Sequence, residues 1–502
     1  MKNEIKSGAI IGYINVIVSV LVTFLYTPIL LRYIGNEEYG LYSLVASVIA
    51  YLSVLDMGFG NAMVRFVSKA QAKKNKNEEE KVNGIFLMLY LVIGLIAFII
   101  GIILLYNIRT LFPALNELEC EKARIIMGIL VVTVAISFPL SIFDSYVMAC
   151  EKFKFLKILN VIKTISIPLT MMPLLILGYK AIAMVLITSI YNILYHFCTF
   201  FCCFKKLNMK VFLSIKQIDV NLLKEIYKYS FFVFLGLIVD TVFNNTDQVI
   251  LGSLCGTVAV SIYSIGTKII SMDTTVSTTI SGLFLPKITK TLEEENSGKK
   301  ISDIFIKVSR IQIYIMMFIL AGFIVLGRQF IYLWVGQQYH DTYFIILLII
   351  GPSIIPLTQN IGISVIQAKN KHQFRSIVYL LIAILNITIS IPLAIKYQGI
   401  GAAAGSAIAT TLGQIITMNI FYWKKIKLDI PKYWRFFIKF SIKVFIISLV
   451  YMLIIRNIEF NWLNFFIFGI IYGIIYILIV YLSMNDEEKM FIKSLKNKVI
   501  LR

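Results

Sequence analysis

The sequence predicts an all-α integral membrane protein with fourteen transmembrane helices, arranged as two pseudo-symmetric six-helix lobes with two added C-terminal helices. Of its 502 residues, 59% are hydrophobic, and the mean hydropathy is +0.84, whereas soluble domains are roughly 45–50% apolar. Nearly all of the apolar runs reach the ~20 residues that a helix needs to cross a bilayer. The fourteen runs lie at about 8–31, 41–64, 84–107, 125–148, 156–178, 181–203, 229–251, 257–286, 309–327, 342–367, 376–395, 399–423, 436–455 and 462–483.

The basic residues between the runs predict the orientation. A net charge of +21 would suggest a nucleic-acid partner in a soluble protein, but here the basic residues lie between apolar runs, so no such partner is expected. The N-terminus, every second loop and the C-terminus together hold 38 of the 48 Lys and Arg, and the opposite loops hold 8. The positive-inside rule then places both termini in the cytoplasm, where the basic loops would attract anionic membrane lipids.

Several common kinds of chemistry leave no signature in this chain. The six cysteines form no CxxC or Cys/His metal spacing and are interpreted as small packing residues. No glycine-rich nucleotide-binding loop occurs, because Gly266-Thr267-Lys268 lies inside an apolar run and lacks the rest of that pattern. The first apolar run is too long for a cleaved signal peptide and is expected to remain as a helix. No metal or other cofactor is expected.

An internal repeat divides the chain. Residues 35–43 align with 256–264, and residues 178–181 align with 399–402, both at an offset of 221. This offset spans six predicted helices, an even number, so the two halves enter the membrane in the same orientation.

The repeat predicts four regions. Residues 1–204 form an N-lobe of helices 1–6, and residues 229–425 form a C-lobe of helices 7–12. Residues 205–228 mix apolar residues with lysines, which indicates either an amphipathic helix on the cytoplasmic surface or a plain linker. Residues 426–502 supply helices 13 and 14, which have few polar residues and are expected to face lipid, and a cytoplasmic tail.

Polar residues recur on one face of each of the two runs that follow this linker. In the seventh run, Gly236, Asp240, Asn244 and Asp247 follow one another at steps of four, four and three, which is the spacing of one helix face. Charges at bilayer depth are costly unless they meet one another or line a wet cavity. The eighth run carries Ser264, Lys268, Ser271, Thr275 and Thr279 on its polar face. We therefore interpret the polar faces of the seventh and eighth runs as walls of a polar cavity in a transporter.

The repeat places a matching polar face in the N-lobe, on the first helix. Its residues Asn15 and Tyr26 are equivalent in position to Gly236 and Asp247. Helix 10 contains prolines and Gln359, and a bent helix that lines a cavity is one way to tolerate prolines. The predicted substrate cavity comprises Lys268, Asp240, Asn244, Asn245, Asp247, Ser264, Ser271, Thr275, Gln359, Asn15 and Tyr26.

Each charged candidate has a structural alternative. Lys268 either attracts an anionic ligand as a point charge or forms a structural ion pair with Asp240 or Asp247. Asp240, Asp247 and Asp56 are candidate ion-coupling residues, and the alternatives for Asp240 and Asp247 are structural partnering or hydrogen bonding to a ligand.

Four segments of the sequence resemble those of a known transporter family. The features that carry the resemblance are the turn 35–43, the segment 219–230, the segment 149–155 and the glycine-rich and alanine-rich segment 399–405. Together with the helix count, they resemble the polysaccharide flippases of the multidrug/oligosaccharidyl-lipid/polysaccharide (MOP) superfamily, the Wzx-type transporters of O-antigen and capsule repeat units.

The resemblance implies a MATE-like fold and transport of undecaprenyl-diphosphate-linked oligosaccharide across the bacterial plasma membrane by alternating access. It implies a lipid-linked oligosaccharide and membrane lipids as partners, with polysaccharide polymerase machinery as a further candidate. No enzymatic activity is expected. The family has no universal catalytic motif, so the cavity residues above come from helix faces alone. For the substrate that the resemblance implies, the anion that Lys268 attracts would be the diphosphate, and the ligand that Asp240 and Asp247 bind would be the sugar.

Four other functions would require features that the sequence lacks or would not need features that it has. A MATE-type cation or multidrug antiporter of the same fold should have an acidic cavity without a central lysine, which Lys268 opposes. A lipid II flippase is expected to have an arginine-rich first helix, which is absent here. A membrane glycosyltransferase or polymerase needs a sizeable external loop, whereas the longest predicted outer loops, 108–124 and 328–341, are short. A purely structural membrane protein would not need charged faces at depth.

Overall fold

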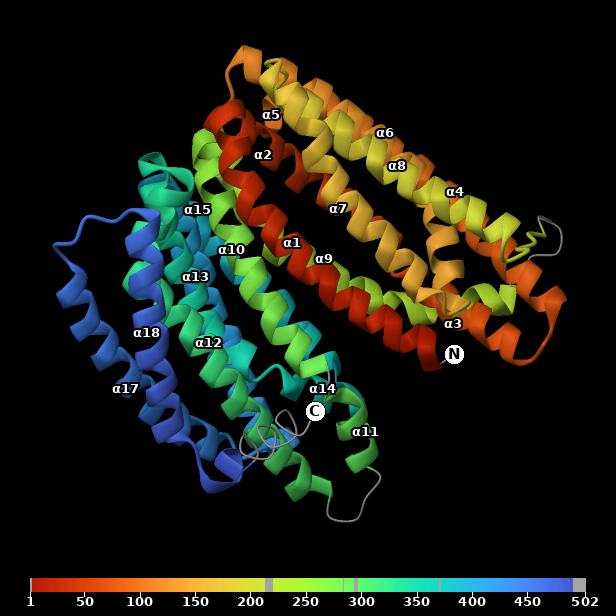
Figure 1. Cartoon of the computed structure of the whole chain (residues 1–502). Coiled ribbons are helices and arrows are strands. Elements are labelled where there is room, and N and C mark those ends of the chain that lie inside the picture. Colours follow the sequence, from red (N-terminus) through yellow and green to blue (C-terminus); the bar gives the residue numbers. More distant parts are fainter. Residues whose placement is uncertain (1, 213–219, 283, 293–296, 370–371, 491–502) are drawn as a thin grey trace. The chain divides into compact units, whose positions relative to one another are not determined.

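The computed structural model describes residues 2–212, 220–282, 284–292, 297–369 and 372–490, and within these ranges it contains helices and loops but no strand (Figure 1). The described residues divide into two compact units. The first comprises residues up to Ser264 together with Ile391–Gly399, and the second comprises Ile265–Ser390 and the residues from Ile400 onward. The boundaries of these units differ from those of the lobes and linker that the internal repeat predicts. The division into lobes and linker stays a prediction.

The first unit is built from α1 to α9 and the beginning of α10. Its elements are α1 (Lys2–Ile34), α2 (Asn36–Ser53), the 3-10 turn η1 (Val54–Asp56), α3 (Phe59–Ala72), α4 (Lys76–Tyr106), α5 (Ile108–Leu111), α6 (Glu117–Ala149), α7 (Phe153–Ile176), α8 (Ala181–Lys205), α9 (Val220–Leu254) and α10 (Thr257–Gly282).

The second unit holds the rest of α10 and the elements that follow. These are α11 (Leu285–Leu292), α12 (Ser297–Val335), η3 (Gln337–Tyr339), α13 (His340–Thr358), α14 (Ile361–Ala368), α15 (His372–Thr410), the π-helical segments η4 (Thr411–Thr417) and η5 (Tyr422–Ile426) on either side of α16 (Met418–Phe421), α17 (Ile430–Ile455) and α18 (Trp462–Ser483).

The all-α, multi-span architecture is confirmed, but the count of fourteen is not. Twelve helical segments of the described chain are long and apolar enough to cross a membrane. The difference arises at two places. The segment Phe374–Ile426 counts once, although the backbone of Gln398 has a φ of 49° and breaks the helix between the two predicted runs. Helix α10, predicted as the eighth span, is too polar to be counted.

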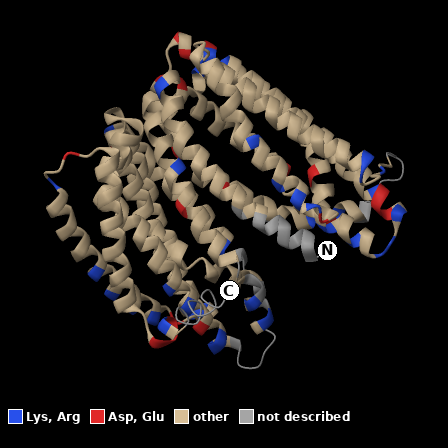
Figure 2. Ribbon diagram, viewed as in Figure 1, with Lys and Arg blue, Asp and Glu red and all other residues tan. Residues whose placement is uncertain are grey.

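The charged residues lie mostly outside the middle sections of the long helices (Figure 2). Figure 2 shows Lys, Arg, Asp and Glu concentrated near the helix ends and in the loops, while long middle sections of the helices carry few of them. The predicted amphipathic helix 205–228 is only partly described. Residues 207–212 are not helical, residues 213–219 lie outside the described ranges, and α9 begins at Val220.

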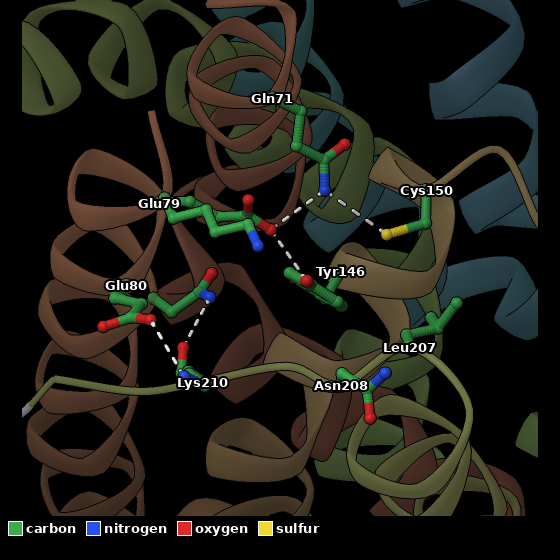
Figure 3. A pocket seen from close by; sticks show the side chains of 10 residues that line it. Gln71, Glu79, Glu80, Tyr146, Cys150, Leu207, Asn208 and Lys210 are labelled. Carbon is green, nitrogen blue, oxygen red and sulfur yellow. Dashed lines mark hydrogen bonds and ion pairs between the residues drawn. The ribbon is translucent and has the colours of Figure 1, made fainter. Parts of the chain in front are cut away.

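In the first unit, α4, α6 and α8 run side by side, and α1 packs on α7 (Figure 1). Helix α6 begins at Glu117 because Asn116 and Glu119 form a capping box, with both hydrogen bonds at 2.9 Å. A buried core lies where α3, α4 and α6 meet, and it includes the aromatic side chains of Phe59, Phe86 and Phe143. At one end of this core, α3, α4, α6 and the segment after α8 line a cavity of about 340 Å³ (Figure 3).

In the second unit, α12 packs against α13, α17 and α18. Buried polar side chains join helices within this unit. The Gln312 amide donates to the Ser277 carbonyl at 3.1 Å, and the hydroxyls of Thr358 and Tyr433 are hydrogen-bonded at 2.6 Å. Such bonds between helices satisfy polar groups that lipid cannot solvate.

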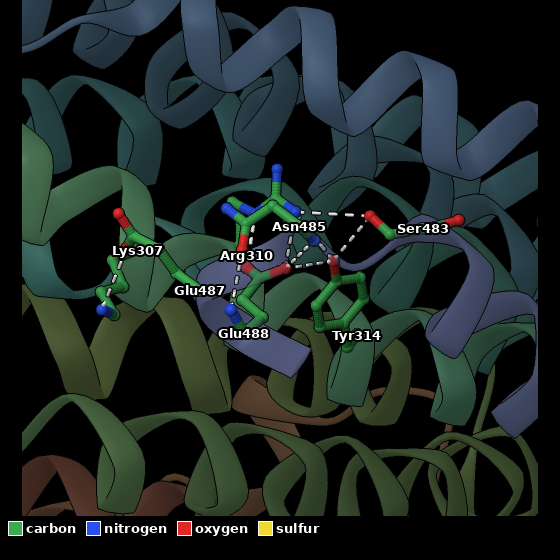
Figure 4. A network of polar contacts seen from close by, with 7 residues as sticks. All are labelled: Lys307, Arg310, Tyr314, Ser483, Asn485, Glu487 and Glu488. Atoms are coloured by element: carbon green, nitrogen blue, oxygen red, sulfur yellow. Dashed lines mark hydrogen bonds and ion pairs between the residues drawn. The ribbon is translucent and has the colours of Figure 1, made fainter. Parts of the chain in front are cut away.

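Arg310 on α12 anchors the segment that follows α18 (Figure 4). Its Nε and Nη2 donate to the two carboxylate oxygens of Glu488 at 2.6 and 2.7 Å, and its guanidinium lies 3.9 Å from the centre of the Phe436 ring on α17. Tyr314 also donates to Glu488, at 3.2 Å. Burial by itself would raise the pKa of Glu488, but hydrogen bonds from Arg310 and from the Asn485 backbone outweigh it, and the pKa lies below its ordinary value.

Gly40 on α2 allows a close helix crossing in the first unit. A Cβ atom at this position would lie 1.8 Å from the backbone carbonyl oxygen of Thr257 at the start of α10. We expect Gly40→Ala to separate the two helices, to destabilise the protein by roughly 1–3 kcal/mol and to lower the apparent unfolding temperature of the detergent-solubilised protein. Gly351→Ala is the matched control, because a Cβ there meets nothing within 4 Å. Equal unfolding temperatures for the two variants would contradict the close crossing.

The lowered pKa of Glu488 makes the anchor depend on pH. The carboxylate stabilises the fold above the ordinary glutamate pKa of about 4.5, and this contribution is lost as the pH falls through the lower, folded-state value. We expect Glu488→Gln to cost about 1.5–3 kcal/mol at pH 7 and to lower the apparent unfolding temperature there, with the difference from the natural protein shrinking below pH 4.5.

Glu487→Gln provides the control for this measurement. Glu487 pairs with Lys307 at 3.6 Å, but both side chains are more than half exposed, so its removal should change the unfolding temperature little. If Glu487→Gln and Glu488→Gln lower the unfolding temperature equally, the ion pair between Arg310 and Glu488 does not anchor this segment.

Candidate transport site

Two of the predicted cavity residues lie one turn apart on an exposed face of α9. Asp240 and Asn244 are both exposed, and the Asn244 amide donates to the backbone carbonyl of Asp240 at 2.7 Å. The next predicted residue, Asn245, is half-buried, and its amide donates to the carbonyl of Thr241 at 3.0 Å. The exposed part of the polar face of α9 is therefore at Asp240 and Asn244.

Asp247 lies on the same side of α9 but is buried, with a side chain only 2% exposed. Tyr263 on α10 donates a short hydrogen bond to its carboxylate. The residues on either side of Asp247 are also bonded to another helix: Gln248 accepts from Ser47 on α2, and Thr246 is 2.6 Å from the Tyr51 hydroxyl. Asp247 thus joins α9 to α10 where α2 also packs.

The candidate residues of α1 have enclosed polar atoms. Asn15 and Tyr26 are half-buried, and neither the Asn15 Oδ1 nor the Tyr26 hydroxyl makes a hydrogen bond with any residue that the structure describes. Enclosed polar atoms of this kind are normally satisfied by water or by a ligand. These two positions therefore suit a polar lining.

Asp56 lies at the break between α2 and α3. The backbone of Met57 and Gly58 is left-handed there, with φ of 51° and 72°, and this separates α2 and η1 from α3. Tyr90 on α4 donates to the Asp56 carboxylate at 2.7 Å, and the backbone N–H groups of Gly58 and Gly60 also bond to it. These donors are all neutral.

The remaining candidates belong mostly to α10 and α13. Ser264 is buried at the end of the first unit, and Lys268 is half-buried in the second. Ser271 and Thr275 are exposed, and each hydroxyl donates at 2.7 Å to a carbonyl of its own helix. Such bonds satisfy the hydroxyls locally and make a polar surface compatible with a helix.

Gln359 is 2% exposed at the end of α13. Its amide exchanges two hydrogen bonds with Asn419, at 2.8 and 3.2 Å, and Asn419 also accepts from the Trp434 indole at 3.1 Å. In this conformation Gln359 contacts a neighbouring helix and faces no open space.

The sequence interpretation did not anticipate the cavity in Figure 3. Glu79 on α4 accepts hydrogen bonds there from Tyr146 at 2.7 Å and from Gln71 at 3.0 Å, and the Gln71 amide lies 3.4 Å from the Cys150 sulfur. Burial raises the pKa of the Cys150 thiol, which favours its protonated form. The residues that line this cavity come from α3, α4, the end of α6 and the segment after α8, so no spacing in the sequence identifies them.

Comparisons with known proteins place the chain in a family. Residues 5–292 match the profile of the family described as polysaccharide biosynthesis protein. A search of curated proteins by sequence found no match.

Solved structures show the same fold. A lipid II flippase, MurJ, in an inward closed conformation superposes with a TM-score of 0.73 at 18% identity, covering 97% of this chain and 99% of that chain. An inward-facing multidrug resistance MATE family transporter of the MOP superfamily superposes with a TM-score of 0.58 at 15% identity, covering 82% of this chain and 99% of that one.

Identities this low show the fold alone. The family match covers more than half of the chain, and the apolar helices agree with the membrane transporters that share its fold. The chain is therefore a multi-pass membrane protein that belongs to the polysaccharide biosynthesis protein family and has the fold of the MOP-superfamily transporters.

Proposed function

We propose that this protein is an ion-coupled flippase. It moves undecaprenyl-diphosphate-linked oligosaccharide repeat units, of the O-antigen or capsule type, from the inner to the outer leaflet of the bacterial plasma membrane by alternating access. Both termini are cytoplasmic, the protein is not an enzyme, and it hands its cargo to polysaccharide polymerase machinery. The family match and the shared fold with a lipid II flippase support a lipid-linked substrate.

The observation that carries the proposal is the chemistry of the exposed surface of α10. Its exposed positions include Ser271, Thr274, Thr275 and Thr278, and the whole helix falls short of the apolarity of a lipid-facing span. By contrast, α18 exposes large apolar side chains, including Ile470, Ile474, Ile477, Leu478 and Leu482. Apolar exposed residues suit lipid, whereas a row of hydroxyls at bilayer depth suits a wet path.

Lys268 gives this polar helix a positive charge. A lysine ammonium is a compact charge on a flexible stem, which suits the capture and release of a diphosphate. On α9, Asp240 and Asn244 present groups that hydrogen-bond to sugar hydroxyls, and Asp240, Asp247 and Asp56 stay candidates for ion coupling. A cavity for cationic drugs gains nothing from Lys268, so the antiporter function of other proteins with this fold is the less favoured candidate.

A flipping assay tests the role of Lys268. The full-length protein is placed in liposomes with a fluorescent undecaprenyl-diphosphate-linked trisaccharide, and the fraction reaching the opposite leaflet is measured by a membrane-impermeant quencher. We expect Lys268→Ala to slow flipping at least about tenfold, because one charge contact to a phosphate contributes about 1.5–3 kcal/mol, and Lys268→Arg to retain more activity. Asp240→Asn should also slow flipping.

The control is Lys439→Ala, which removes an exposed lysine from α17 in the same unit as Lys268. It should flip the probe at the natural rate. Natural rates for both Lys268→Ala and Asp240→Asn, at equal protein abundance, would contradict the site assignment. Failure of the natural protein to flip the probe, together with export of a cationic dye, would favour the antiporter.

A further inference from the structure

The cavity in Figure 3 lies wholly within the first unit and is separate from the polar faces of α9 and α10. It forms where α3, α4 and the end of α6 meet the segment after α8, and its volume is about 340 Å³. Its lining residues lie at or just beyond the ends of the apolar runs 84–107, 125–148 and 181–203. Since the hydrocarbon layer ends where such runs end, the cavity lies at the depth of the lipid headgroups.

The lining of this cavity is polar. Of the ten described residues that line it, Leu207 alone has a side chain made only of hydrocarbon. Pockets for drug-like molecules are predominantly apolar, so an apolar drug or an acyl chain would gain little here. The volume is also many times the ~10–15 Å³ that one water molecule needs, so a bare metal ion would leave most of it unfilled. Size and lining together indicate a hydrophilic organic group.

The protein itself holds the walls of the cavity in place. The Asn83 amide on α4 donates to the Lys210 backbone carbonyl at 2.9 Å, and the Phe212 backbone N–H donates to the Glu80 carbonyl at 3.1 Å. Both bonds fasten the segment after α8 to α4. The cavity is therefore a preformed feature of the fold, as ligand sites usually are.

Asn83 supplies an acceptor that needs a partner. The residue lines the cavity and is 0% exposed, and its Oδ1 makes no hydrogen bond with any residue that the structure describes. The bond from its Nδ2 to Lys210 fixes which end of the amide is left over. Because buried acceptors are normally satisfied by water or by a ligand, a ligand that contacts Asn83 must present an N–H or O–H donor.

Two charges of opposite sign line the cavity without an ion pair. Glu80 pairs with Lys210 at 3.9 Å. In contrast, Glu79 accepts hydrogen bonds from the neutral donors shown in Figure 3, and Lys76 is exposed at the first position of α4. Neither Glu79 nor Lys76 forms an ion pair with a residue in the described ranges. The cavity therefore fits a ligand that carries one positive and one negative group.

The order of these residues along α4 sets the direction of the ligand. Lys76, Glu79 and Asn83 follow one another at steps of three and four, which places them on one helix face. Glu79 and Asn83 both accept hydrogen bonds, and a primary ammonium group has three N–H donors to give them. Lys76 lies one turn away, where its compact charge on a flexible stem suits a phosphate.

We propose that this cavity binds the phosphoethanolamine headgroup of a membrane lipid. The ammonium group of the headgroup contacts Glu79 and Asn83, and its phosphate contacts Lys76. Two carbon atoms join the ammonium to the phosphate, and the flexible stem of Lys76 covers the remaining distance along α4. A lipid is the source that the depth of the cavity favours. The inference does not depend on the proposed transport function, because lipid binding is measured without it.

Two other common headgroups fit these contacts less well. The trimethylammonium group of phosphocholine has no N–H, so it leaves the buried Asn83 Oδ1 unsatisfied, and an unsatisfied buried acceptor is costly. The phosphoglycerol headgroup carries no positive charge for Glu79. The site should therefore discriminate among lipids that share the same acyl chains.

Native mass spectrometry tests this discrimination. The full-length protein is reconstituted in nanodiscs that contain equal amounts of dioleoyl phosphatidylethanolamine, phosphatidylcholine and phosphatidylglycerol, and the lipids that stay bound on release are identified. We expect phosphatidylethanolamine to be retained about tenfold more than phosphatidylcholine, because a hydrogen bond to a charged group contributes on this scale. Equal retention of the three lipids would overturn the proposal.

Glu79→Gln and Glu78→Gln form a matched pair for this measurement. Glu79→Gln keeps an acceptor for Tyr146 and Gln71 but removes the charge, and it should lower phosphatidylethanolamine retention about tenfold. Glu78 belongs to the same turn but pairs with Lys73 at 3.1 Å, and it does not line the cavity, so Glu78→Gln should bind as the natural protein does. Equal lipid preferences in the two variants would contradict the assignment of the ammonium to Glu79.

Lys76→Gln separates the phosphate contact from the ammonium contact. Phosphatidylethanolamine and phosphatidylcholine both carry the phosphate, so this variant should retain less of each without changing their ratio. A changed ratio with unchanged phosphatidylcholine retention would contradict the placement of the phosphate at Lys76.

Cys150 on the cavity wall reports where the headgroup binds and from which source. In lipid-depleted protein in detergent, the modification of each cysteine by N-ethylmaleimide is followed by peptide mass spectrometry. Dioleoyl phosphatidylethanolamine should slow the modification of Cys150 and leave that of the exposed Cys198 unchanged. Equal protection by soluble glycerophosphoethanolamine at the same concentration would overturn the lipid source, and no protection by either probe would overturn the site.

Discussion

The cost of placing polar groups in a bilayer governs this structure. Hydrocarbon offers no hydrogen bonds, so backbone groups must be satisfied within helices and polar side chains must be paired or face water. The helices follow this rule in different ways. Helix α18 exposes large apolar side chains, whereas α10 exposes a row of hydroxyls beside Lys268. This difference between exposed surfaces is the physical basis for assigning a wet path to α10 and a lipid contact to α18.

The same cost explains where the helices are joined. Asp247 with Tyr263, Gln359 with Asn419, and Thr358 with Tyr433 are buried polar pairs that connect separate helices within each unit. Gly40 allows α2 to approach the start of α10 at a distance that no larger residue permits. The Arg310–Glu488 anchor holds the segment after α18 against α12. These contacts stabilise each unit, and they also reduce the number of polar residues left to line a cavity.

The candidate residues form two groups that differ in solvent exposure. Asp240 and Asn244 are exposed, whereas Asp247 and Gln359 are buried in contacts between helices. In the first unit, the carboxylate of Asp144 on α6 lies 2.9 Å from the imidazole Nδ1 of His196 on α8. In our proposal the substrate contacts the exposed polar residues of α9 and α10.

The sequence by itself determined the class of this protein. Apolar runs of bilayer length, together with their basic loops, specify an all-α membrane protein, because the hydrophobic thickness fixes the length of a spanning helix. The short motifs also pointed to the family. Only the tertiary structure decided which polar residues are accessible: Asp240 and Asp247 share a helix face in the sequence pattern, but α2 and α10 cover one and leave the other exposed. The contact between Asp144 and His196 likewise joins residues from two helices, and helix periodicity describes only residues on the same helix.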